Sequence, residues 1–254
     1  VLAAGTFANI IFTIIFGIIL LIFFSSAFVP AGINYMNVYP ASQIKMADIT
    51  SINGLPLANQ DQIISLSDSD LIEITANNKN YFANASILKA TISNNLAEVI
   101  VYDNTPAFNT RIAGDLETGS QSARIQGAVT EFDGMKILSV EDLQAQLNKH
   151  SPGDQIVIKT IQKSAKSTNA LSNLYLGEEK EFNLKLGDKN GRAFIGLYLV
   201  PELQQSGSLA SWFYSFISKT KNPTIYYTSY LGGFGIFLYD LLWWVVITCV
   251  SVAL

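Results

Sequence analysis

The feature that most constrains this sequence is its first apolar stretch, which runs from Phe7 to Val29 without a charged side chain. At a rise of about 1.5 Å per residue, a helix of this length measures about 34 Å, which is enough to cross the hydrocarbon core of a bilayer. The stretch is longer than the apolar core of a secretory signal, and no Lys or Arg precedes it. The sequence therefore predicts a transmembrane helix within residues 1–30.

A second apolar stretch ends the sequence, and the charged residues lie between the two. All 16 Lys and Arg, and all but one of the 20 Asp and Glu, fall between Lys45 and Lys221. Residues 241–254 carry no charge, which corresponds to about 21 Å of helix and is less than a full bilayer core. We expect a second, truncated transmembrane helix within residues 225–254 and an aromatic-rich amphipathic helix in the interface at residues 207–221. The chain is thus predicted to be a multi-pass integral membrane protein in contact with the lipid bilayer.

The residue types that build catalytic or metal centres are scarce. The chain has one His, His150, and one Cys, Cys249. A zinc-binding helix needs two His residues four positions apart with a Glu between them, and a serine triad would have to use His150. No run of basic residues interleaved with aromatic residues indicates a nucleic-acid partner. We predict no catalytic residue, no metal ligand and no nucleic-acid site within this chain.

The polar middle contains an internal repeat. Residues 48–57 and 128–137 each read as a strand, a two-residue turn and a short second strand, and the turns are Asn53-Gly54 and Asp133-Gly134. The offset between the two turns is the size of a small domain. The pattern predicts a tandem duplication of a domain rather than a short solenoid repeat.

The second copy continues with a clear helix signal. Ser139 can cap a helix that carries Glu141 and Asp142 in its first turn. One face of that helix is apolar, and a Ser-Pro-Gly-Asp turn at residues 151–154 then leads into a strand at residues 155–160. The apolar face consists of Val140, Leu143 and Leu147.

This order of elements resembles a PDZ domain of the kind found in bacterial and archaeal membrane proteases. The resemblance covers residues 96–200 and closes on Phe194-Ile195-Gly196-Leu197. The first copy, residues 33–95, is a more divergent PDZ-like domain. The fold class expected is a membrane protein in which transmembrane α-helices flank two small α+β domains, each a PDZ-like, partly open β-barrel.

The start of the first apolar stretch resembles a second protein family. Gly5, Phe7, Ala8 and Asn9 match the Gly-Pro-x-x-x-Asn-like pattern that opens one helix of the site-2 proteases, the intramembrane zinc metalloproteases, although Thr6 replaces the usual Pro. The resemblance implies that Gly5 and Asn9 support an active site. It also implies that a His-Glu-x-x-His helix precedes this chain and that the third zinc ligand follows it.

Together, the two resemblances imply a central portion of an intramembrane zinc metalloendopeptidase that cleaves membrane-spanning substrates. Zinc would be the cofactor of the complete protein, and membrane proteins would be its substrates. The PDZ domains would lie on the extracytoplasmic side, although Lys219 and Lys221 weakly favour the opposite orientation. A non-catalytic, membrane-anchored PDZ adaptor and a PDZ-containing serine protease are the alternatives.

PDZ domains accept a peptide as an added strand, so the resemblance also implies a groove. The segment Phe194, Ile195, Gly196 and Leu197 would form one wall of it. The helix face of Val140, Leu143 and Leu147 would form the other. The second possibility is that both domains bind no peptide and only exclude substrates with bulky ectodomains.

Overall fold

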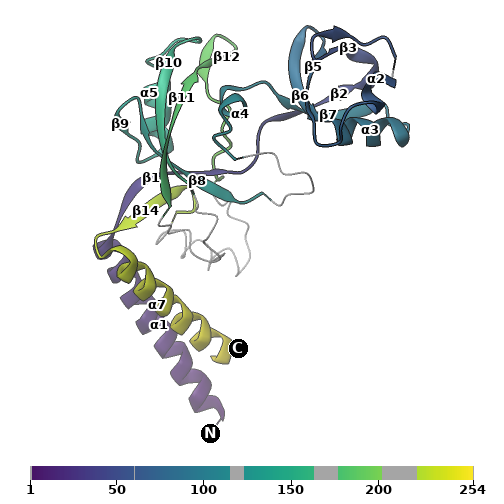
Figure 1. Ribbon diagram of the computed structural model, residues 1–254. Coiled ribbons are helices and arrows are strands. Elements are labelled where there is room, and N and C mark those ends of the chain that lie inside the picture. The colour runs from purple at the N-terminus through teal and green to yellow at the C-terminus, as the bar shows by residue number, and fades with distance from the viewer. Residues whose placement is uncertain (1, 60, 115–122, 163–176, 202–221, 254) are drawn as a thin grey trace.

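The protein consists of a pair of long apolar helices and two α+β domains (Figure 1). The computed structural model describes residues 2–59, 61–114, 123–162, 177–201 and 222–253. The amphipathic helix predicted at residues 207–221 lies outside the described residues.

The long helices are α1 (Leu2–Ala27) and α7 (Gly232–Ala253), which lie side by side as a hairpin (Figure 1). Both are long and apolar enough to cross a membrane, judged by length and composition. Aromatic rings hold them together near the domains, where Phe24 and Tyr239 lie 5.4 Å apart between ring centroids. Because α7 also includes the glycine-rich stretch and Asp240, it is longer than the charge-free segment on which the prediction of a truncated span rested.

The first domain is formed by residues 41–103 and contains a six-stranded sheet in the order β2-β7-β6-β5-β3-β4. Two helices and a short 3-10 turn pack with this sheet. The elements are β2 (Ala41–Lys45), η1 (Met46–Asp48), β3 (Ile49–Ile52), β4 (Leu55–Pro56), α2 (Asp61–Ile64), β5 (Leu71–Ala76), β6 (Lys79–Asn84), α3 (Ala85–Ser93) and β7 (Glu98–Asp103).

The second domain contains a sheet in the order β11-β10-β8-β1-β14, with β9 paired to β8 and a separate β12–β13 hairpin. Its first and last strands come from the chain segments next to the two long helices. The elements are β1 (Phe28–Met36), α4 (Pro106–Thr110), β8 (Ile125–Phe132), β9 (Met135–Lys136), α5 (Val140–Leu147), β10 (Gln155–Gln162), β11 (Glu178–Lys185), β12 (Gly187–Lys189), β13 (Arg192–Phe194) and β14 (Ile225–Ser229).

These sheets correct the predicted domain boundaries. Residues 33–36, assigned to the first copy, belong to β1 and pair with β8 of the second domain. Strand β7 was assigned to the second copy, but it pairs with β2 and β6 of the first. Strand β14 was assigned to the second span and instead pairs with β1. Each of these strands has one partner that lies far away in the sequence, namely β8 for β1, β2 for β7 and β1 for β14, and a local pattern contains no trace of that partner.

The two predicted hairpins of the repeat are confirmed, and they agree down to single hydrogen bonds. Both turns have two residues with positive φ, as an Asn-Gly or Asp-Gly hairpin requires: Asn53 and Gly54 at 47° and 75°, and Asp133 and Gly134 at 49° and 78°. After each turn, the main chain folds back in the same way. Leu57 N donates to the carbonyl of Thr50 at 3.0 Å, and at the equivalent place in the second copy Ile137 N donates to that of Thr130 at 2.9 Å.

A β-bulge lies at the same place in both copies. The register of β3 with β5 shifts between Ile49 and Ser51, and that of β8 with β10 shifts opposite Lys159 and Thr160. The residue in the bulge is a threonine each time, and its hydroxyl donates to a carbonyl of the neighbouring strand. Thr50 Oγ1 reaches the oxygen of Thr75 at 3.1 Å, and Thr130 Oγ1 reaches that of Lys159 at 3.2 Å.

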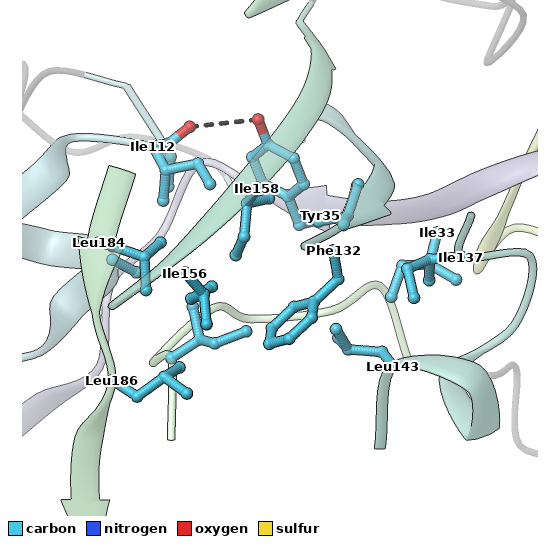
Figure 2. Close-up of a cluster of buried hydrophobic side chains, with 14 of the residues drawn as sticks. Ile33, Tyr35, Ile112, Phe132, Ile137, Leu143, Ile156, Ile158, Leu184 and Leu186 are labelled. Atoms are coloured by element: carbon cyan, nitrogen blue, oxygen red, sulfur yellow. Dashed lines mark hydrogen bonds between the residues drawn. The ribbon is translucent and has the colours of Figure 1, made fainter. Parts of the chain in front are cut away.

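Each domain has its own hydrophobic core. Figure 2 shows the core of the second domain, where Phe132 lies among aliphatic side chains from β10, β11 and α5. The first domain has a smaller aliphatic core in which Ile63, Ile72 and Ile74 are fully buried. Among the described residues of that core, no aromatic side chain is fully buried.

The two cores meet at Phe108 on α4. Its ring stacks on Phe82 of the first domain at 4.8 Å between centroids, and on Tyr102 at 5.6 Å. Tyr39, in the connection between β1 and β2, approaches it edge-on at 5.1 Å. The Arg111 guanidinium covers the same ring at 4.1 Å. One aromatic residue thus ties the first domain to the second.

Candidate functional site

Helix α5 provides the first wall of the predicted groove. Ser139 Oγ accepts a hydrogen bond from Asp142 N at 3.1 Å, and the Asp142 carboxylate accepts one from Ser139 N at 3.0 Å. This reciprocal capping box fixes where the helix begins. Leu143 is buried, while Val140 and Leu147 are half-buried against the same core. The predicted apolar face therefore exists, and it is largely occupied by the domain's own core.

The segment after β13 provides the second wall. Ile195 is buried, and its carbonyl accepts a hydrogen bond from Ala107 N of α4 at 2.9 Å. Gly196 has φ of +86°, and a Cβ at this position would lie 2.5 Å from Thr105 Cβ. Thr105 is the N-cap of α4, and its Oγ1 atom accepts a hydrogen bond from Phe108 N. Only glycine fits at position 196 without displacing Thr105. These two residues are anchored to α4 rather than open to a ligand.

Phe194 lies apart from the other predicted groove residues. It pairs with Gly187 in the β12–β13 hairpin, and its ring lies 5.0 Å from Lys189 Nζ. Among the described residues, those that pack on the core of the second domain do not include Phe194. The structure thus brings the other predicted groove side chains to one core, with Gly196 buried between two of them, and leaves Phe194 in the neighbouring hairpin.

Residues 198–200, which the sequence analysis did not single out, extend the predicted segment beyond Leu197. Tyr198 O accepts from Met36 N at 2.9 Å, and Val200 N donates to Asn34 O at 3.1 Å, so this segment pairs with β1. Leu197 and Leu199 turn their side chains to the core. In an extended chain, the main-chain groups of successive residues point to opposite edges. Since Tyr198 and Val200 bond to β1, the N–H and C=O groups of Leu197 and Leu199 point away from β1.

Within the described part of the chain, that second edge is unpaired. Among the described residues, no main-chain hydrogen bond involves the N–H or C=O groups of Leu197 or Leu199. An exposed row of such groups is what an extended peptide needs in order to add a strand. We call residues 197–200 the acceptor strand. The apolar run Leu197-Tyr198-Leu199-Val200 could have indicated it from the sequence.

A buried polar network lies beneath the end of β1 that pairs with the acceptor strand. Tyr35 is fully buried, and its hydroxyl donates to the Ile112 carbonyl at 3.2 Å while accepting from Gln162 Nε2 at 3.1 Å. Burial raises the pKa of Tyr35 to about 12. Gly127 makes room for this ring, because a Cβ there would lie 2.8 Å from the Tyr35 hydroxyl. The network fixes the register of β1 against β8.

The two predicted active-site support residues lie on α1, toward the end far from the domains (Figure 1). Asn9 is half-buried, and its carbonyl accepts from Thr13 Oγ1 at 2.9 Å. Gly5 is exposed, and a Cβ there would meet nothing within 4 Å. Gly5 and Asn9 therefore lie on the apolar helix α1, whereas the predicted groove residues lie in the second domain.

No metal-binding cluster exists among the described residues. His150 lies just after α5, with its Nδ1 atom 3.5 Å from Asp154 Oδ2 and its ring against Phe132 at 5.4 Å. This is a structural position at a helix end. Asn84, the first residue of an Asn-Ala-Ser glycosylation triplet, is buried and directly precedes α3.

No protein-family model matches this sequence, and a search of curated proteins found no matching relative.

Proposed function

We propose that this chain is the central part of an intramembrane zinc metalloprotease that cleaves membrane-spanning substrates. In this proposal the second domain is a PDZ domain that receives or filters the substrate, and the first domain is a divergent PDZ-like copy. The observation that carries the proposal is that the apolar helices continue directly into β1 and β14, and that β1 pairs with the acceptor strand. A domain connected in this way can deliver an extended segment to the membrane at a fixed position.

The joining involves very few residues. Helix α1 ends at Ala27 and β1 begins at Phe28, and only Tyr230 and Leu231 separate β14 from α7. Tyr230 N donates to Ala27 O at 3.0 Å across the two connections. Because β1 also pairs with the acceptor strand, only the acceptor strand would separate a peptide added at Leu197 and Leu199 from β1, the strand that directly follows α1.

Strand addition is the recognition mode that suits this edge. Main-chain hydrogen bonds to Leu197 and Leu199 would give affinity, and side-chain contacts along α5 would give specificity. Val140 and Leu147 are only half-buried, so they retain apolar surface for such contacts. The same edge serves a size filter equally well, because a bulky ectodomain could not approach it.

Zinc does not fit the described residues of this chain. They contain no ligand cluster, and His150 is engaged at the end of α5. The ligands would have to come from the rest of the complete protein. What this chain would contribute is the amide of Asn9 in the apolar layer, where a polar side chain is costly and is a functional candidate by default.

We propose that the two domains lie on the extracytoplasmic side and that the protein is multi-pass. A labelling experiment tests this. The native thiol is removed by Cys249→Ser, and a new one is placed on an exposed position of β11 by Lys180→Cys. An impermeant thiol reagent should label this new cysteine from outside intact cells. Reaction only after the cytoplasmic side is opened would reverse the topology.

Catalysis is tested on the complete protein in lipid. Cleavage of a reporter transmembrane segment should occur, should stop when zinc is chelated and should return when zinc is restored. Asn9→Leu should reduce turnover at least about tenfold at normal expression, whereas Thr13→Val on the same helix should not. A complete protein that binds peptides but never cleaves would be the membrane-anchored adaptor instead.

A further inference from the structure

Asn34 on β1 joins three separate parts of the molecule. It is fully buried, and its main-chain N–H donates to Thr224 O at 2.7 Å while its carbonyl accepts from Val200 N at 3.1 Å. Its side-chain amide donates twice more, to Pro223 O at 2.9 Å and to Ile225 O at 3.0 Å. One residue of β1 thus binds both the acceptor strand and the segment that begins β14.

A further bond closes this junction into a ring. Thr224 Oγ1 donates to Val200 O at 3.1 Å, so the acceptor strand and the approach to β14 are also bonded to each other. On its other edge, β1 pairs with β8 through Asn34 and Ala128. A displacement of Val200 therefore cannot leave residues 223–225 unaffected.

The chain on both sides of the junction continues into the helical hairpin. At the end of β1 nearest α1, the Phe28 ring stacks on Phe24 at 5.0 Å and meets Tyr239 edge-on at 5.6 Å. Tyr227 of β14 packs against Phe24 at 4.9 Å. Both strands that leave the junction are thus fastened to the helix pair by aromatic contacts.

The side chain of Asn34 uses its two donors and leaves its acceptor unused. Its Oδ1 atom is buried and has no hydrogen-bond partner among the described residues. An unsatisfied buried acceptor is unfavourable, but an apolar residue at this position would leave the carbonyls of Pro223 and Ile225 without the two donors of the amide. What the amide provides is its two donors, which hold residues 223–225 against β1.

We propose that Asn34 is a positioning residue that makes the acceptor strand and the α1–α7 hairpin one mechanical unit. A change at the acceptor strand is then transmitted through Asn34 to β14 and to the start of α7. This inference rests on the proposed function for its meaning, because it supplies a route from substrate reception to the membrane helices. The connection itself can be tested without any ligand.

The test is hydrogen exchange of the 254-residue chain in lipid nanodiscs. Asn34→Leu should raise exchange about tenfold at Met36 and Val200, in β14 and at Tyr230 just before α7, all together, since about 1.4 kcal/mol of lost bonding corresponds to tenfold. Strands β10 and β11 should keep the wild-type rates. Thr130→Val removes one hydroxyl bond to β10 in the same sheet, and it should change exchange at Met36, at Val200 and in β14 by no more than about twofold.

A second variant keeps the test decisive if Asn34→Leu does not fold. Thr224→Val removes only the bond to Val200 and should produce the same joint pattern with a smaller, about threefold, rise. Faster exchange confined to β14, or confined to the acceptor strand, would overturn the proposal. Peptides play no part in these readouts, so a failure of peptide binding would overturn only the proposed function.

Discussion

The two domains share the same unit, and the parts in which they differ point to their roles. Both contain a hairpin, a helix and two further strands in the same order, with a bulge and a threonine hydrogen bond at equivalent places. In the first domain the helix after the hairpin, α2, has four residues, whereas α5 in the second has eight residues and a capping box.

The larger difference concerns what lies beside the first strand of each unit. Strand β8 is covered by β1, which comes directly from α1, and β1 in turn carries the acceptor strand. Strand β3 pairs only with β5 and the short β4 within the described residues. The repeat therefore supplies two similar folds, and among the described residues β1 pairs with a strand of the second fold and with none of the first. That is why we place substrate reception in the second domain.

The equivalent core residues Phe132 and Ile52 give the strongest test of this division. Phe132→Ala should destabilise the second domain by about 3–5 kcal/mol and expose the acceptor strand to protease, because a large buried ring is lost. Ile52→Ala should cost the first domain about 2–4 kcal/mol and leave the acceptor strand protected. Pulse proteolysis with mass spectrometry separates the two. Loss of the second domain in Ile52→Ala would mean that the domains are not independent units.

Alkaline pH should weaken the second domain through Tyr35. The folded state raises the pKa of Tyr35 from 10.0 to about 12, so the unfolded chain loses this proton first. The corresponding stability is complete below pH 10 and disappears as the pH rises to 12, a total of about 2–3 kcal/mol. Tyr35→Phe should remove this pH dependence, and the exposed Tyr198→Phe should not. An unchanged slope in Tyr35→Phe would contradict the buried network.

Phe82→Ala tests how the domains are held together. Removal of the ring that stacks on Phe108 should cost about 1–2 kcal/mol of interdomain contact while both cores remain folded. Spin labels at Lys79→Cys and Lys180→Cys, with Cys249→Ser, should show a broader distance distribution than in the wild type. Phe194→Ala, whose ring contacts Lys189, is the control and should leave the distribution narrow.

The smallest expected effect is at the cap of α5. Ser139→Ala should cost about 1 kcal/mol and speed exchange in the first turn of α5, because a helix amide loses its acceptor. Asn84→Ala at the start of α3 should have less effect on its own helix, since the Asn84 side chain accepts no capping bond. Equal effects at the two helices would remove the distinction we draw between α5 and the helices of the first domain.

The parts of the fold that could be predicted are those determined by neighbouring residues. The two glycine turns, the Ser139 cap and the apolar face of α5 all depend on contacts between residues close together in the chain, and the sequence contains each signal in full. The apolar helices were equally clear from the absence of charge.

The parts that could not be predicted depend on distant partners. Residues 28–36 look like the end of an apolar span, and only pairing with β8 and β14, which both lie far away in the sequence, makes them a strand. The acceptor strand has the same origin, because Leu199 becomes part of a sheet only beside Tyr35. The predicted groove segment, Phe194 to Leu197, therefore stops short of Leu199, the residue that pairs with Tyr35.

The central claim is that the acceptor strand of the second domain receives an extended peptide. It is tested most directly by hydrogen exchange of the chain in nanodiscs, with and without a panel of short peptides whose free C-terminal residue is Ala, Val, Leu or Phe. We predict that at least one peptide slows exchange at Leu197 and Leu199 and along α5, and leaves every strand of the first domain unchanged. Protection that appears at the edge strand β2 of the first domain instead, or at neither domain with millimolar peptide, would contradict the claim.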